Sequence, residues 1–319
     1  MSERNLAPRR LRRSMAVAGA LALAAGLAAL GGGTASASAP HAAPLAKHHK
    51  PQPHGRFGIV PMRSTSTAST ASRVHTFSSP RSGGTGGPLN YGGGPVQHNV
   101  QVYLVFWGSQ WDSDSNGVQS YMQNLFSGLG TSSDSWSTVT SQYTDSSGSG
   151  PTFGGAVLAG TWVDDGSAAP QSAAQSDIAA EAENGVSHFG ITPTGDTQVV
   201  VLSPSGTSPD GFPNSGFCAW HDFDGTVSYT NMPYVLDAGS SCGANSVSSQ
   251  LDGFSIVEGH EYAESATDPQ PSSGWVAGDG EENGDLCAWY NLGSISLSTG
   301  SFAMQPTWSN AANGCAMSG

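Results

Sequence analysis

The residues best suited to chemistry lie in one short stretch, VEGHEYAESATDP, from Val257 to Pro269. On a helix, His260 and Glu264 lie on one face about one turn apart, where both side chains can reach a single cation. Glu261 directly follows the histidine, in the place where the zinc-peptidase motif H-E-x-x-H has its general base. Glu264 stands where that motif has its second histidine. Because carboxylates bind zinc and also harder cations, the pattern predicts a metal site with zinc as the first choice and calcium as the alternative.

A second acidic group follows this stretch and offers a further ligand. Asp268 ends the expected helix, because a proline follows it. In the loop GEENGDLC at residues 280–287, Glu282 and Asp285 are the candidates for the third ligand, with Asp268 behind them. These carboxylates repel one another without a cation, and no Lys or Arg follows Arg81 to neutralise them. The alternative is a pair of hydrated acidic surfaces that do no chemistry.

The elements that position these residues are expected in a single α+β domain. The long helix starts near Asn245 or Ser246, with Val247 among its inward-facing residues. Residues 99–107 are apolar on both faces, which predicts a buried central strand, and residues 198–202 are expected to form another strand. A further strand is expected at residues 227–236, and helices at residues 118–129 and 171–189.

Three polar residues of these elements are not expected to take part in catalysis. Glu181 and Glu183 lie in the alanine-rich helix and are interpreted as solvated. His221, in the stretch FCAWH, is interpreted as a packed or surface histidine in preference to a metal ligand.

The N-terminal part divides into two segments. Residues 1–39 carry an arginine-rich start, an apolar run and a small-residue region, which predicts a secretory signal peptide and an exported protein without a membrane anchor after cleavage. Residues 40–87 are rich in Pro, Ser, Thr and Gly and are predicted to be a disordered linker or pro-segment. The folded domain is therefore expected at residues 88–319.

The charge distribution excludes two classes of partner. All 11 Lys and Arg lie at or before Arg81, whereas Glu3 is the only one of the 24 Asp and Glu in that part. A folded domain without cations cannot replace the counterions of a nucleic acid, nor bind an anionic membrane electrostatically. Its carboxylates must be solvated, hydrogen-bonded, protonated or bound to metal.

Four cysteines in an exported chain predict two disulfides, for which three pairings exist. We favour Cys218 with Cys242 and Cys287 with Cys315, the second of which ties the C-terminal tail beside the expected site.

Five blocks, in order along the domain, carry a family resemblance. They are GGGPV at 92–96, GFCAWH at 216–221, DG-x-SIVEGHEYAESATDP from 252, ENGDLCAW at 282–289 and QPTWSN-x-x-NGC at 305–315. In these blocks the chain resembles the exordium-like, phosphate-induced secreted proteins of plants and their bacterial relatives. The resemblance implies a zincin-like fold, with a mixed β-sheet packed on the metal-binding helix. It also implies His260 and Glu264 as ligands and Glu261 as base, and it matches Glu282 and Asp285 to the family's acidic block.

The first functional prediction is a secreted, monomeric, metal-dependent hydrolase, a zinc peptidase acting on an extracellular protein or peptide. The alternative is a non-catalytic extracellular protein with a structural zinc or calcium site, which binds a cell-wall component or another partner at the cell surface. An open coordination position favours catalysis, and a closed, oxygen-rich shell favours structure. Acid-dependent carboxyl catalysis without metal ranks third, because it leaves His260 without a role.

Overall fold

The computed structural model describes residues 58–63 and 86–319. The predicted signal peptide at residues 1–39 lies outside the described residues, as does most of the segment at 40–87. The described chain is organised on a mixed sheet of six strands. In spatial order these are β1 (Ile59–Pro61), β6 (Phe217–Phe223), β7 (Ser228–Met232), β5 (Thr197–Leu202), β3 (Gln101–Trp107) and β4 (Leu158–Asp164). β7, β5, β3 and β4 are parallel, whereas β6 and β1 add an antiparallel edge.

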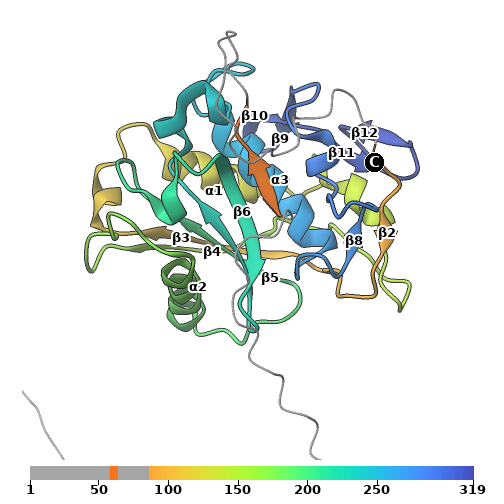
Figure 1. Cartoon of the computed structure of the whole chain (residues 1–319), viewed down its shortest axis with the longest axis horizontal. Coiled ribbons are helices and arrows are strands. Elements are labelled where there is room, and N and C mark those ends of the chain that lie inside the picture. Colours follow the sequence, from red (N-terminus) through yellow and green to blue (C-terminus); the bar gives the residue numbers. More distant parts are fainter. Residues whose placement is uncertain (1–57, 64–85) are drawn as a thin grey trace, which may run out of the picture. The chain divides into compact units, whose positions relative to one another are not determined.

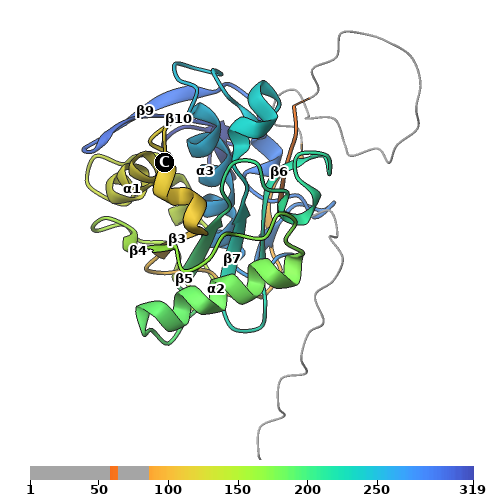
Figure 2. The same ribbon diagram turned by 90° about the vertical axis from the view of Figure 1, so that its left-hand side faces the viewer.

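Helices cover both faces of this sheet (Figures 1 and 2). Figure 2 shows α2 (Gln175–Phe189) on one side and α1 (Val118–Gly128) and α3 (Asp252–Thr267) on the other. The hairpin of β9 (Gly293–Leu297) and β10 (Gly300–Met304) packs against α1 and α3 through β10. The mixed sheet and the packed helices confirm the α+β class.

Shorter elements complete the described chain. Two small sheets pair β2 (Asn90–Tyr91) with β8 (Trp275–Val276), and β11 (Thr307–Ser309) with β12 (Gly314–Ala316). Five 3-10 helices are η1 (Ser109–Ser113), η2 (Ser137–Gln142), η3 (Pro209–Gly211), η4 (Val235–Cys242) and η5 (Asp285–Cys287). No helix in the described ranges combines the length and the apolar character that a membrane span needs.

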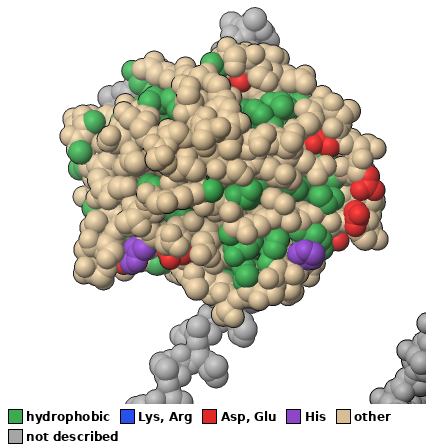
Figure 3. All heavy atoms as spheres, turned by 180° about the vertical axis from the view of Figure 1, so that it is seen from behind, with side chains coloured by type: hydrophobic (Ala, Val, Ile, Leu, Met, Phe, Trp, Pro, Cys, Tyr) green, Lys and Arg blue, Asp and Glu red, His purple; other side chains and the backbone are tan. Residues whose placement is uncertain are grey.

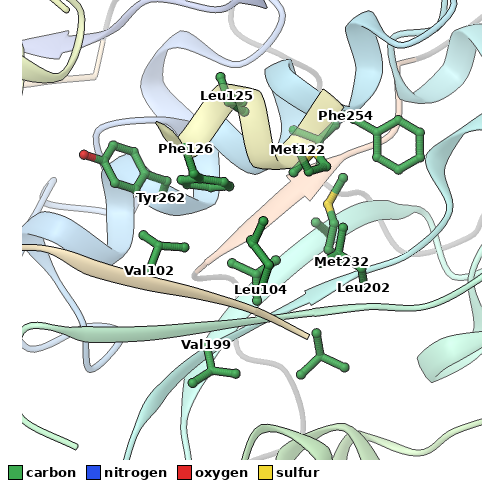
Figure 4. Close-up of a cluster of buried hydrophobic side chains, with 14 of the residues drawn as sticks. Val102, Leu104, Met122, Leu125, Phe126, Val199, Leu202, Met232, Phe254 and Tyr262 are labelled. Atoms are coloured by element: carbon green, nitrogen blue, oxygen red, sulfur yellow. The ribbon is translucent and has the colours of Figure 1, made fainter. Parts of the chain in front are cut away.

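The main core lies between the sheet and the pair α1 and α3. Figure 4 shows Val102 and Leu104 of β3 below Met122 and Phe126 of α1, with Tyr262 of α3 beside them. α1 supplies its buried residues at helical spacing, so that one face of the helix meets the sheet. The interior of β3 is buried on both faces because helices lie on both sides of it.

α3 is buried on every side, although it contains several acidic residues. Small residues let its neighbours approach. A Cβ added at Gly259 would lie 2.4 Å from Cε of Met304, and one at Gly253 would lie 2.2 Å from the carbonyl oxygen of Cys242. The charged face of α3 therefore points into protein and not into water, which rules out the interpretation of the motif as a solvated helix face.

The start of α3 differs from the prediction. The helix begins at Asp252 and not near Asn245 or Ser246. The Asp252 carboxylate accepts hydrogen bonds from the backbone N–H groups of Val247, Ser248 and Ser249, which holds that segment in a turn. Val247, expected to face inward, is 38 % exposed.

The structure confirms both predicted disulfides. Cys218 is bonded to Cys242, which joins β6 to the end of η4, and Cys287 is bonded to Cys315, which joins η5 to β12. The described residues contain no free cysteine. Two disulfides fit a chain that folds in an oxidising compartment.

A further difference concerns residues 40–87, expected to form one disordered segment. Within them, Ile59–Pro61 form β1 and pair with the edge strand β6. The pattern in three residues is too short to predict a strand, and the pairing depends on an edge that exists only in the folded domain.

Glu181 of α2 is buried, in contrast to the prediction, whereas Glu183 is exposed as expected. Burial is the main cause that raises the pKa of Glu181 to about 7, against a hydrogen bond donated by Asn184 at 3.0 Å. The nearby Asp164 raises this pKa further. Ionisation of Glu181 therefore costs more in the folded state than in the unfolded state.

We expect Glu181→Gln to change how stability depends on pH. In the wild type the contribution of Glu181 is fully present below the usual pKa of 4.5 and is lost as pH rises through about 7. Glutamine cannot ionise, so the free energy of unfolding should fall less between about pH 5 and about pH 8 in the variant. Urea denaturation at both pH values measures this. Glu183→Gln is the matched control, and an equal effect of both variants would contradict the prediction.

Candidate metal centre

Three elements bring the acidic residues and histidines to one place. α3 supplies His260, Glu261 and Glu264, β6 supplies His221, and the segment from the loop before η5 to its first residue supplies Glu282 and Asp285. The side chains of His260, Glu261, Glu264 and Glu282 are 0 % exposed, and that of Asp285 is 10 % exposed. The loop is held against α3 by Asn283, whose Nδ2 donates to the carbonyl oxygen of Ala263 at 2.8 Å and to Oγ1 of Thr267 at 2.7 Å.

A glycine lets this loop reach the motif. A Cβ added at Gly284 would lie 2.7 Å from Cγ of His260 and 2.9 Å from Oε1 of Glu264. The next residue, Asp285, donates its backbone N–H to the same Oε1 at 3.0 Å. The sequence NGD therefore places an acidic side chain directly beside the helical pair.

The first potential ligand group consists of His260, Glu264 and Asp285. Nε2 of His260 lies 2.7 Å from Oε1 of Glu264 and 3.5 Å from Oδ1 of Asp285. All potential ligand atoms of the group lie within 4.8 Å of one another, which is close enough for a common cation. These are residues that the sequence analysis selected.

The second group contains a residue that the sequence analysis did not select as a ligand. His221 of β6 is buried against α3, with Nδ1 2.9 Å from Oε2 of Glu261 and 3.6 Å from Oε2 of Glu264. Its Nε2 lies 3.5 Å from Oε2 of Glu282. His221, Glu261 and Glu264 form a second set of atoms within 4.8 Å. His221 is therefore a packed histidine, as predicted, but it packs among carboxylates. The available signal was alternation in β6, since His221 shares a sheet face with Phe217 and Ala219.

Glu264 connects the two groups. Its Oε1 faces His260 and its Oε2 faces His221. One carboxylate thus belongs to both sets of potential ligands.

Asp268 has a different position from the other candidates. Its carboxylate accepts hydrogen bonds from the backbone N–H groups of Ser272 at 2.8 Å and Gly274 at 2.7 Å, and it belongs to neither group. It therefore closes the turn after α3 and supports the centre through its position beside Glu282, whose pKa it raises.

The pKa values show the electrostatic cost of this cluster without a cation. Burial is the main cause that raises the pKa of Glu282 well above its usual range, and the charges of Glu264 and Asp268 add to it. Burial also raises the pKa of Asp285 to about 7. Burial lowers the pKa of His221, but the hydrogen bond and charge of Glu261 outweigh it and raise the value to about 9. Without a cation, these side chains reduce their mutual repulsion by binding protons.

Several buried polar atoms of the cluster have no hydrogen-bond partner among the described residues. They are Nδ1 of His260, Oε1 of Glu261, Oε2 of Glu264 and both carboxylate oxygens of Glu258 and Glu282. Leaving a buried polar group unpaired costs about 1–3 kcal/mol. Glu258, one turn before Glu261 on α3, was not singled out by the sequence analysis, and burial raises its pKa well above the usual range.

No Lys or Arg side chain neutralises this cluster within the described ranges. Arg63 is the only Lys or Arg there, and it lies over the ring of Trp289 and donates to Oγ of Ser246. Figure 3 shows one face of the surface, where Asp and Glu are seen without Lys or Arg. Imidazole and carboxylate donors are those that zinc takes, and the unpaired atoms point to the same conclusion, so the residues fit a bound cation.

The centre is closed to solvent apart from the small exposed part of Asp285. Two hollows on the described surface, one around His98 and Phe153 and the other around Asn99 and Val157, include none of its residues.

Comparisons of the chain with protein-family models, with curated proteins and with solved structures find no match.

Proposed function

We propose that this protein is a secreted, metal-dependent hydrolase, and most simply a zinc peptidase with an extracellular protein or peptide as substrate. The observation that carries the proposal is the buried set of two histidines and several carboxylates, which has unpaired polar atoms and no Lys or Arg beside it among the described residues. The helical H-E-x-x-E motif, which places Glu261 beside the ligand pair, extends the proposal from metal binding to hydrolysis.

The residues have separate roles in this proposal. His260, Glu264 and Asp285 hold the cation, which when bound supplies a Lewis acid that polarises a carbonyl and makes water more acidic. Glu261 accepts the proton of the attacking water and passes it to the leaving amine. Its Oε1 is free to do so, because Oε2 is the oxygen that contacts His221 at 2.9 Å. His221 is a positioning residue that fixes the orientation of Glu261.

A structural metal site is the second candidate, and the burial of the centre favours it. The potential ligands are mostly carboxylate oxygens, a set that calcium also accepts. In that case the cation would hold α3, β6 and the loop before η5 together, and the protein would act through binding at the cell surface.

Metal removal separates the two candidates. The purified mature protein is incubated with a peptide mixture before chelation, after chelation and after reloading with zinc, and the products are identified by mass spectrometry. The hydrolase proposal predicts cleavage that disappears with the metal and returns with it. Cleavage that continues unchanged in the metal-free protein would overturn it. A metal-dependent rise in melting temperature with no cleavage in any sample would establish the structural candidate instead.

A further inference from the structure

The strand β1 joins the sheet next to His221 of the candidate centre. It pairs antiparallel with β6, in the register Ile59 with Trp220 and Val60 with Ala219. The backbone N–H of His221 donates to the carbonyl oxygen of Gly58 at 3.1 Å. Figure 1 shows β1, in orange, beside α3, and the two elements are in contact.

Gly58 lies against the imidazole ring of His221. A Cβ added at Gly58 would lie 3.0 Å from both Cε1 and Nδ1 of that ring. Nδ1 is the atom that contacts Glu261 at 2.9 Å. The segment of residues 58–63 therefore covers the β6 side of the cluster. The space between its backbone at position 58 and the His221 ring leaves little room for any side chain larger than that of glycine.

The segment is anchored by bonds that an extended peptide of another sequence could also make. Met62 donates its backbone N–H to the carbonyl oxygen of Gly216 at 2.9 Å, and the carbonyl oxygen of Pro61 accepts from Nε1 of Trp289 at 2.7 Å. Val60 is fully buried and supplies the main apolar contact. Main-chain bonds with one buried side chain are the pattern of peptide recognition by strand addition.

Charge complements these contacts. The guanidinium of Arg63 lies 5.5 Å from the centre of the Trp289 ring and donates to Oγ of Ser246 at 2.8 Å. Arg63 is the only basic residue in the described ranges, and residues 86–319 carry acidic groups without Lys or Arg. The positive charge of Arg63 is therefore attracted by the net negative charge of residues 86–319.

We propose that residues 58–63 are an intramolecular blocking strand, which occupies the β6 edge where an extended peptide substrate binds and keeps the metal centre closed. This inference rests on the proposed function and adds the substrate class. The substrate is a peptide that joins β6 as an antiparallel strand. Its glycine would lie against the ring of His221, an aliphatic residue two positions later would be buried, and a basic residue would lie near Trp289. Displacement of the strand would expose the His221 side of the centre.

The test uses the full mature chain with three variants. Val60→Asp places a charge in the core and should release the strand, and Arg63→Gln should weaken its anchor. Arg81→Gln, which removes the same charge outside the described residues, is the matched control. Two rates are measured: the removal of metal by a chelator, and the modification of His221 by diethyl pyrocarbonate in metal-stripped protein. Exposed His188 serves as the internal reference for the second rate.

If the strand blocks the centre, both rates should increase about tenfold in Val60→Asp and less in Arg63→Gln, because local opening becomes easier. Arg81→Gln should behave as the wild type. A synthetic peptide of residues 57–63 should restore the slow rates. Unchanged rates in a Val60→Asp protein that still melts cooperatively would overturn the proposal. If that variant does not fold, the same criterion applies to Arg63→Gln.

The outcomes distinguish this inference from the proposed function. Modification of His221 does not require a metal, so the blocking strand can be established even in a protein that holds none. Faster metal loss without peptide cleavage would establish the strand and leave the structural candidate as the function. Peptide cleavage with unchanged rates in the released variants would establish the hydrolase and overturn the strand.

Discussion

Glu264→Gln is expected to weaken metal binding by at least about 100-fold, because the amide removes one charge and one acceptor oxygen from a ligand shared by both groups. Oε1 faces His260 at 2.7 Å and Oε2 faces His221 at 3.6 Å, so the amide can present its one oxygen to only one of the two histidines. Competition with a chelator of known affinity measures the change. Glu183→Gln, at an exposed position on α2, is the matched control.

The same variant should also destabilise the metal-free protein. Burial raises the pKa of the Glu264 carboxyl, but the charge and hydrogen bond of His260, together with the charge of His221, outweigh it and hold that pKa below its usual value. The ionised carboxylate is therefore favoured in the folded state, and glutamine leaves both buried histidines without it. Metal-stripped Glu264→Gln should melt below the temperature of metal-stripped wild type. A variant that keeps wild-type metal affinity would show that Glu264 is not a ligand.

Glu261→Gln is expected to lower the rate of peptide hydrolysis by about 10²–10⁴-fold while the protein keeps its metal. Glutamine has nearly the same shape and can still accept a hydrogen bond from His221, so the packing of α3 is retained. What it lacks is the ability to take a proton from water. The measurement is kcat together with metal content for the same preparation.

His221→Asn provides the companion to this experiment. If His221 positions Glu261 through the contact of 2.9 Å, the variant should retain part of the activity and shift its pH profile, since the charge that Glu261 faces has changed. If wild type and Glu261→Gln had equal activity, Glu261 would not be the general base. A loss of metal in Glu261→Gln would assign Glu261 to the ligands instead.

The sequence predicted the part of the site that local spacing determines. His260 and Glu264 meet because residues four apart share a helix face, and Glu282 and Asp285 lie in a loop that follows the helix closely. The mixed sheet with packed helices follows in the same way from apolar strands such as Gln101–Trp107 and from helical spacing.

The missing parts depend on contacts between distant segments. His221 reaches Glu261 only because β6 lies against α3, and β1 forms only because β6 offers an unpaired edge. The burial of Glu181 depends on how α2 packs on the sheet, which the local pattern of an alanine-rich helix does not determine. Asp252 was part of the predicted helix interior, but its carboxylate accepts hydrogen bonds from three backbone N–H groups of the preceding segment and holds that segment in a turn.

The most direct test of the central claim is the metal content of the purified mature protein, measured by elemental mass spectrometry. Wild type is compared with the double variant His260→Ala and Glu264→Ala. The proposed centre predicts about one equivalent of zinc in the wild type and its loss in the double variant. A wild-type protein that holds no metal after purification and dialysis against zinc would contradict the claim, as would a double variant that binds zinc as tightly as the wild type.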